Sequence, residues 1–220
     1  MPSPAGSRRR FRRLKPEERR QELVEATLDC LSRLGPHGTG VREICRQVDV
    51  SPGLLSYYFD SKEDLILEAL RALTRDIYDK MRSVLVDGED SPEQRLRSAI
   101  GLYFSSGEIA TERSGAYLAF WTLGRTDPAV RRIQRAAYRG RQGLLEPVLE
   151  ELAYERGVRI DRRSAADGLA GLLDGLWLEI CIGASTLSPA AAVSLSWSWL
   201  DTYVGGSPRR CRDRVGTSKK

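Results

Sequence analysis

Apolar side chains recur through most of the chain at the three- and four-residue spacing of a helix, and no strand-like alternation persists. The first periodic stripe consists of Leu23, Ala26, Cys30, Leu31 and Leu34. Gly35-Pro36 follows this stripe and is expected to end a helix that begins near Pro16. The pattern predicts an all-α protein with about nine helices.

Four residue pairs place a helix N-cap directly before a proline, and they are Ser51-Pro52, Ser91-Pro92, Asp127-Pro128 and Ser188-Pro189. Proline is favoured at the first helical position because its missing N–H would have no partner there. Gln94 follows Ser91 by three residues, which is a capping box. We expect a long helix over about 61–86, followed by helices at about 91–107, 111–124, 127–156, 162–185 and 188–204.

Two short helices are predicted before the long one, at about 41–48 and from Ser51-Pro52 onward, with Asp49 between them. Two short helices joined by a tight turn are typical of a helix-turn-helix. Its expected buried set is Val41, Ile44, Val50, Leu55 and Phe59. The second helix would then direct Pro52, Gly53, Ser56 and Tyr57 outward.

Charge is concentrated at the two ends of the chain. The formal net charge is +5; the first 20 residues carry +6 and residues 205–220 carry +5, so the segment between them carries −6. An acidic body with basic ends argues against a uniform nucleic-acid coat but allows a local polyanion contact. The arginines before the first helix either enter a DNA minor groove or form a solvated tail, and they are Arg8, Arg9, Arg10, Arg12 and Arg13.

The residue inventory argues against several other classes of protein. The four cysteines lie far apart and His37 is the single histidine, so we expect no metal site, no cofactor and no catalytic constellation. The most apolar stretch, 169–187, contains Asp174 and Glu179, which favours a buried helix over a membrane span. No signal peptide is evident, so we expect a cytoplasmic protein with reduced thiols that is not an enzyme.

Four segments within residues 16–70 form a distinctive set, and they are Val41-Arg42-Glu43-Ile44, Val50-Ser51-Pro52-Gly53-Leu54-Leu55, Tyr57-Tyr58-Phe59 and Ser61-Lys62-Glu63-Asp64-Leu65. Through these segments the chain resembles the TetR family of bacterial transcriptional regulators. The resemblance implies a three-helix DNA-binding domain and a C-terminal helical domain that binds an effector and dimerises.

The resemblance also implies which residues contact double-stranded DNA at an inverted-repeat operator. Those expected to face the major groove are Ser51, Pro52, Gly53, Leu54 and Tyr57, with the small Ser56 allowing close approach. Tyr58 and Lys62 are expected on phosphates, and Arg42 on the backbone or a base. The alternative for Tyr57 and Tyr58 is packing between helices.

Some positions depart from the family pattern. Asp49 stands where the family usually has glycine, and aspartate tolerates a left-handed turn at some cost. Gly40 occupies the position at which the family usually has a Ser or Thr N-cap, so Thr39 is an alternative cap. Thr39 is also the last of the expected DNA contacts.

The C-terminal half contains two strings, Leu118-Ala119-Phe120-Trp121 and Leu172-Leu173-Asp174-Gly175-Leu176-Trp177-Leu178, that resemble the BetI-like branch, the repressors of choline-to-glycine-betaine genes. Aromatic faces attract quaternary ammonium groups. The expected cage consists of Tyr103, Tyr117, Phe120, Trp121 and Trp177, with Asp174 as counter-charge. The alternative is that these aromatic side chains belong to the core.

Small residues on the penultimate helix, together with apolar residues on the last, predict a four-helix seam between two copies of the chain. The expected seam residues are Gly168, Gly171, Gly175, Leu195, Trp199 and Leu200. The resulting domain plan is a basic arm (1–15), a DNA-binding domain (16–60), an effector-binding and dimerisation domain (61–204) and a basic disordered tail (205–220).

The sequence thus predicts a dimeric DNA-binding repressor that a small molecule, choline-like or otherwise cationic, releases from its operator. A second hypothesis is a TetR-like DNA-binding protein without a small-molecule effector, controlled by a protein partner.

Overall fold

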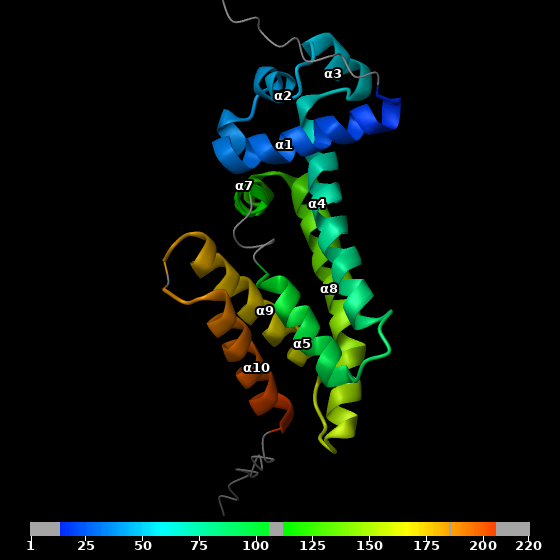
Figure 1. Ribbon diagram of the computed structural model, residues 1–220, viewed down its shortest axis with the longest axis vertical. Helices are drawn as coiled ribbons and strands as arrows, with labels where there is room; N and C mark the ends of the chain where they lie inside the picture. The colour runs from blue at the N-terminus through cyan, green and yellow to red at the C-terminus, as the bar shows by residue number, and fades with distance from the viewer. Residues whose placement is uncertain (1–13, 106–111, 185, 206–220) are drawn as a thin grey trace, which may run out of the picture. The chain divides into compact units, whose positions relative to one another are not determined.

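The structure is a computed structural model that describes residues 14–105, 112–184 and 186–205. These residues form nine α-helices and no strand, which confirms the all-α prediction (Figure 1). The helices are α1 (Pro16–Gly38), α2 (Val41–Gln47), α3 (Pro52–Tyr58), α4 (Lys62–Leu85), α5 (Pro92–Tyr103), α7 (Glu112–Thr126), α8 (Pro128–Glu155), α9 (Arg162–Cys181) and α10 (Pro189–Gly205). The predicted arm, apart from Leu14 and Lys15, and the tail beyond Gly205 lie outside the described residues.

All four predicted N-caps are confirmed. Ser51 Oγ accepts from the backbone N–H of Leu54, at 3.3 Å, and Ser91 forms its capping box with Gln94. The Asp127 carboxylate accepts from two N–H groups at the start of α8, and Ser188 Oγ accepts from one at the start of α10. These bonds satisfy N–H groups that have no partner within the helix.

The chain divides into two compact units, and the division does not follow the order of the sequence. The first unit holds residues 1–72 together with 115–130, and the second holds 73–114 together with 131–220. The predicted boundary at 60/61 falls at the start of α4, whereas this division falls inside α4. Each unit is described separately below.

In the first unit, α1 packs against α2 and α2 packs against α3 (Figure 1). The fully buried side chains of this unit include Leu23, Leu31, Ile44 and Leu65. Leu34, predicted to continue the buried stripe of α1, is 43% exposed. The next residue, Gly35, has φ 66° and ψ 180°, so regular helix geometry breaks there and the stripe ends before Leu34.

Helix α7 approaches α1 closely at one glycine of the first unit. A Cβ added to Gly115 would lie 2.5 Å from both the carbonyl oxygen and the hydroxyl of Ser32. Side chains do not tolerate this distance, so only glycine fits here without a shift of one helix.

In the second unit, α5, α9 and α10 pack against one another (Figure 1). Gly168 on α9 leaves space for the ring of Trp199 on α10, because a Cβ there would lie 2.9 Å from that ring. Among the described residues, no helix is long and apolar enough to cross a membrane.

Two helices in the second unit end before their predicted limits. Helix α5 ends at Tyr103 rather than near 107, and α9 ends at Cys181 rather than near 185. At the end of α9, Gly183 has φ 66° and the N–H of Ala184 donates to the carbonyl of Glu179. This is a Schellman motif, in which a glycine in the left-handed region stops a helix.

Candidate DNA-binding surface and buried polar cluster

The turn between α2 and α3 is built as a helix-turn-helix requires. The N–H of Val50 donates to the carbonyl of Cys45, and Asp49 between them has φ 54°. This arrangement is a Schellman motif with aspartate where glycine is usual. It reverses the chain directly after α2 and places the Ser51 N-cap at the start of α3.

Helix α3 buries one side and exposes the other. Leu55 is buried and Phe59, just after the helix, is buried as well. Tyr57 on the opposite side is 78% exposed, and its ring meets the ring of Tyr58 edge-on at 5.1 Å between centroids. The alternative in which Tyr57 packs between helices therefore does not match this structure, whereas Tyr58 is half-buried.

The remaining expected DNA contacts on α2 and α3 lie on accessible positions. Arg42, Ser51, Pro52, Gly53 and Ser56 are exposed, and Leu54 is half-exposed. Of the expected buried set, Ile44 is fully buried, whereas Val41 and Val50 are half-buried.

Thr39 has neither of its two expected roles, the DNA contact or the N-cap of α2. It is buried, and its hydroxyl donates to the carbonyl of Gly35 at 2.8 Å, across the last turn of α1. The N-cap of α2 is Gly40, which offers no side-chain hydrogen bond. The carbonyl of Gly35 also accepts from the backbone N–H of Thr39 at 3.2 Å, so Thr39 closes α1 through two bonds and, being buried, presents no surface to DNA.

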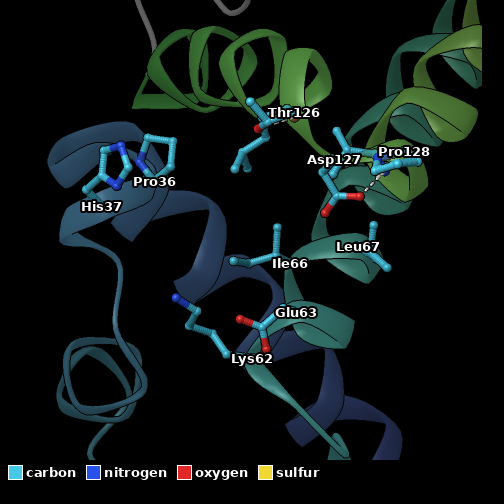
Figure 2. A pocket seen from close by; sticks show the side chains of 11 residues that line it. Pro36, His37, Lys62, Glu63, Ile66, Leu67, Thr126, Asp127 and Pro128 are labelled. Carbon is cyan, nitrogen blue, oxygen red and sulfur yellow. Dashed lines mark hydrogen bonds between the residues drawn. The ribbon is translucent and has the colours of Figure 1, made fainter.

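Lys62 lines a surface pocket of about 470 Å³ within the first unit (Figure 2). The pocket lies between the end of α1, the start of α4 and the turn from α7 to α8, where Asp127 caps α8 (Figure 2). Its walls combine Lys62 and His37 with Glu63, Asp127 and apolar side chains. Charges of both signs favour no single ligand chemistry, so we assign none to it.

The second unit contains a polar cluster that joins three helices. Arg141 on α8 donates to both carboxylate oxygens of Asp174 on α9, at 2.9 and 2.8 Å. The hydroxyl of Tyr103 on α5 donates to Asp174 and accepts from Arg141 at 3.0 Å. Burial raises the pKa of Tyr103; burial would lower the pKa of Arg141, but its hydrogen bonds to Asp174 raise it. The cluster therefore holds a charged pair beside a neutral phenol.

A second group of polar side chains adjoins this cluster. Gln142 donates to the hydroxyl of Tyr138 and to Asp167, and the Arg141 guanidinium lies 5.4 Å from the centre of the Tyr138 ring. Three buried side-chain atoms have no hydrogen-bond partner among the described residues, and two of them belong to these two groups, Nε of Arg141 and Oε1 of Gln142. Sequence reasoning missed Arg141, because nothing in the local sequence indicates that this arginine of α8 meets Asp174.

The residues of the expected cage are divided between the two units. Tyr103 and Asp174 are in contact through their hydrogen bond, and Trp177 on α9 is buried in the same unit. Tyr117, Phe120 and Trp121 belong to the first unit, where Phe120 is buried and Trp121 is 38% exposed. Asp174, expected as the counter-charge of a ligand, is already paired with Arg141.

The expected dimer residues also separate into two groups. Gly168 and Trp199 contact each other within one chain, and Leu200 is fully buried. A Cβ at Gly171 or Gly175 would meet no described atom within 4 Å, and Leu195 is exposed. Only Gly171, Gly175 and Leu195 clearly offer surface to a second chain.

The capped turn, the exposed face of α3 and the helical unit that follows define a helix-turn-helix protein of the class that binds duplex DNA. Two family models match it, "Bacterial regulatory proteins, tetR family" over residues 23–69 and "BetI-type transcriptional repressor, C-terminal" over residues 92–205. The chain belongs to the TetR family of bacterial transcriptional regulators, with a C-terminal domain of the BetI type.

Curated relatives and solved structures agree with this assignment. The chain is 31% identical over 189 residues to the HTH-type transcriptional regulator BetI of Burkholderia mallei, covering 86% of this chain and 94% of that protein. It is 33% identical to the BetI of Klebsiella pneumoniae, covering 84% and 94%.

Two solved structures are similar along most of their length. The crystal structure of a putative transcriptional regulator from Pseudomonas aeruginosa PAO1 has a TM-score of 0.81 and 36% identity, covering 94% of this chain and 100% of that one. A putative transcriptional regulator from Saccharomonospora viridis, solved in complex with choline, has a TM-score of 0.76 and 22% identity, covering 84% and 96%. The second similarity concerns the fold alone.

Proposed function

We propose that this protein is a dimeric repressor that binds an inverted-repeat operator and leaves it when a small-molecule effector binds. It acts in the cytoplasm on double-stranded DNA, with α3 in the major groove of each half-site. The observation that carries this proposal is the face of α3 centred on Tyr57, which is 78% exposed on a helix held in place by a buried Leu55. A large aromatic side chain left in solvent on a rigid helix is suited to contact a partner.

Substitution of Tyr57 by alanine tests the DNA-binding face. We expect Tyr57→Ala and Lys62→Ala each to weaken operator binding by about 5- to 100-fold, the range of a lost base or phosphate contact. Fluorescence anisotropy with a selected operator measures the affinity, while circular dichroism and mass in solution report fold and assembly. Tyr154→Ala is the matched control, because Tyr154 is 86% exposed at the far end of α8. Unchanged binding by both test variants would overturn the assigned face.

Dimerisation is proposed through α9 and α10. A dimer of this class must hold its two recognition helices about 34–36 Å apart to reach successive turns of DNA. The open space at Gly171 and Gly175 and the exposed Leu195 support a helix of a second chain lying there. An effector that favours a different spacing of the two recognition helices lowers operator affinity.

For the effector, we propose a small organic cation that competes with Arg141 for Asp174. The choline bound to the regulator of Saccharomonospora viridis and the aromatic side chains Tyr103 and Trp177 of this unit support a cationic ligand. Because Arg141 and a ligand cation would repel each other, the ligand displaces the guanidinium when it binds Asp174. The Arg141–Asp174 ion pair would then have two states, intact without the effector and displaced when the effector is bound.

A thermal-shift titration with choline tests this proposal. Removal of the competing cation in Arg141→Met should lower the apparent dissociation constant for choline about tenfold, because like charges in a buried site cost on the order of 1 kcal/mol or more. Arg139→Met is the control, since Arg139 is an exposed arginine two residues away on α8. If neither the original chain nor Arg141→Met responds to choline or to other small cations, the proposed effector class is wrong. Control by a protein partner then becomes the preferred hypothesis.

A further inference from the structure

The recognition helix is poor in the side chains that usually read bases. Its seven residues, Pro52–Tyr58, include no arginine, lysine, asparagine, glutamine, aspartate or glutamate. These are the side chains that form the paired hydrogen bonds to guanine, adenine or cytosine in the major groove. The side chains of α3 instead offer apolar carbon surface and the hydroxyl groups of Ser56, Tyr57 and Tyr58.

The exposed positions of α3 are arranged around its carbon surface. Gly53 and Tyr57 lie four residues apart and therefore share one line along the helix, in the middle of the face opposite Leu55. Leu54 flanks this line on one side and Ser56 on the other. Since Gly53 has no side chain, the Tyr57 ring and the Leu54 methyl groups dominate the centre of this face.

The serine hydroxyls beside this surface already have backbone partners. Ser51 Oγ accepts from the N–H of Leu54 as the N-cap, and Ser56 Oγ donates to the carbonyl of Pro52 at 3.2 Å. Ser56 would have to give up this bond in order to donate to a base, whereas Ser51, which only accepts, keeps its hydroxyl hydrogen but lies before the first turn of α3. On α3 itself, the exposed face therefore combines the Tyr57 hydroxyl with the carbon surface of the Tyr57 ring and of Leu54.

We infer that this protein recognises its half-site chiefly through thymine 5-methyl groups, contacted by Leu54 and by the ring of Tyr57. The thymine methyl is the apolar group that base edges present in the major groove. This inference rests on the proposed function, because it assumes that α3 enters that groove. It predicts that the central base pairs of each half-site are T·A or A·T pairs whose thymine methyl groups face α3.

Replacement of thymine by deoxyuridine tests the inference on the DNA alone. The full-length chain first selects an operator from random duplex DNA, and each half-site thymine is then replaced in turn by deoxyuridine, which lacks only the methyl group. We expect a loss of about fourfold at one or more of these positions, because one buried methylene-sized group contributes about 0.8 kcal/mol. The base pairing of the duplex does not change, and no variant protein has to fold.

A second substitution in the DNA separates the methyl group from the hydrogen-bonding pattern. Where a T·A pair is essential, replacement by C·G should weaken binding, and 5-methylcytosine in place of that cytosine should restore part of the affinity. Cytosine and 5-methylcytosine pair identically, so only the methyl group differs between the two duplexes.

Leu54→Ala assigns the contact to its side chain. We expect the variant to bind the thymine operator more weakly, yet to bind the thymine and deoxyuridine operators equally at the position that Leu54 contacts. Leu34→Ala is the matched control, because Leu34 is a partly exposed leucine on α1 of the same unit. It should keep the full difference between the two operators.

The outcomes distinguish this inference from the proposed function. If the chain selects no operator, DNA binding itself is wrong. If an operator is selected but deoxyuridine changes affinity less than 1.5-fold at every position, whereas C·G substitutions abolish binding, the methyl inference is overturned. Recognition then depends on hydrogen bonds, for example from Arg42, or on DNA shape.

Discussion

At the scale of single residues, Asp49 combines a functional position with a conformational cost. It has φ 54°, the only positive φ outside glycine among the described residues. A left-handed conformation costs an L-residue roughly 1–2 kcal/mol, less where a short polar side chain helps. The turn between α2 and α3 is thus maintained by the packing of both helices despite an unfavourable residue.

Asp49→Gly should therefore raise the free energy of unfolding by about 0.5–1 kcal/mol, because glycine adopts this conformation without a Cβ penalty. Urea denaturation followed by circular dichroism measures this change. Asp49→Ala should lower stability instead, since alanine has the Cβ but no polar group to form local bonds. Equal stability of the three proteins would mean that the positive φ carries no cost.

At the scale of helices, what a glycine faces on a neighbouring helix decides whether a side chain fits there. Helix α7 meets α1 at Gly115, where a Cβ would lie 2.5 Å from Ser32. Gly143 lies within α8, and a Cβ there would meet no described atom within 4 Å. The two glycines look alike in the sequence and differ only in what faces them.

The pair gives opposite expectations for one substitution. Gly115→Ala should destabilise the protein by about 1–3 kcal/mol, the cost of overpacking a helix contact. Gly143→Ala should be neutral or stabilise it by up to about 1 kcal/mol, because alanine favours helix. Thermal unfolding of both variants decides the matter, and a stable Gly115→Ala protein would show that α7 and α1 can separate at little cost.

At the scale of the whole molecule, two copies of the chain are needed to match an inverted repeat. One protomer explains Gly168 and Leu200 fully, since Gly168 accommodates Trp199 and Leu200 is buried. It does not explain why α9 has glycine at 171 and 175, where a side chain would meet open space. Glycine in a helix interior costs up to about 1 kcal/mol relative to alanine, and the proposed dimer, with a second chain against these positions, would account for them.

Gly171→Leu and Gly175→Leu should consequently leave each protomer folded but lower the mass in solution from dimer toward monomer. Light scattering coupled to size-exclusion chromatography measures the mass, and helicity checks the fold. The same variants should lose operator affinity because they lose paired binding. Gly143→Leu, on α8, should keep the mass of the original chain; dimers of unchanged mass in both α9 variants would place the interface elsewhere.

The helices, their caps and the helix-turn-helix were predictable from local patterns along the chain. These features depend on residues within about four positions of one another, as in the bonds of Ser51, Ser91, Asp127 and Ser188 to nearby N–H groups. The same locality made Tyr57 and Leu55 predictable as opposite sides of α3.

Which distant side chains meet depends on how the helices pack, and local patterns did not predict it. Arg141 and Asp174 are 33 residues apart, and Tyr103 and Asp174 are 71 apart, so periodicity along the chain could not pair them. Likewise, the packed structure shows that Thr39 is buried rather than accessible to DNA. Local patterns determine the side of its helix on which a side chain lies. Packing between helices determines which residues that side chain contacts. The role of a charged residue or a glycine depends on those contacts.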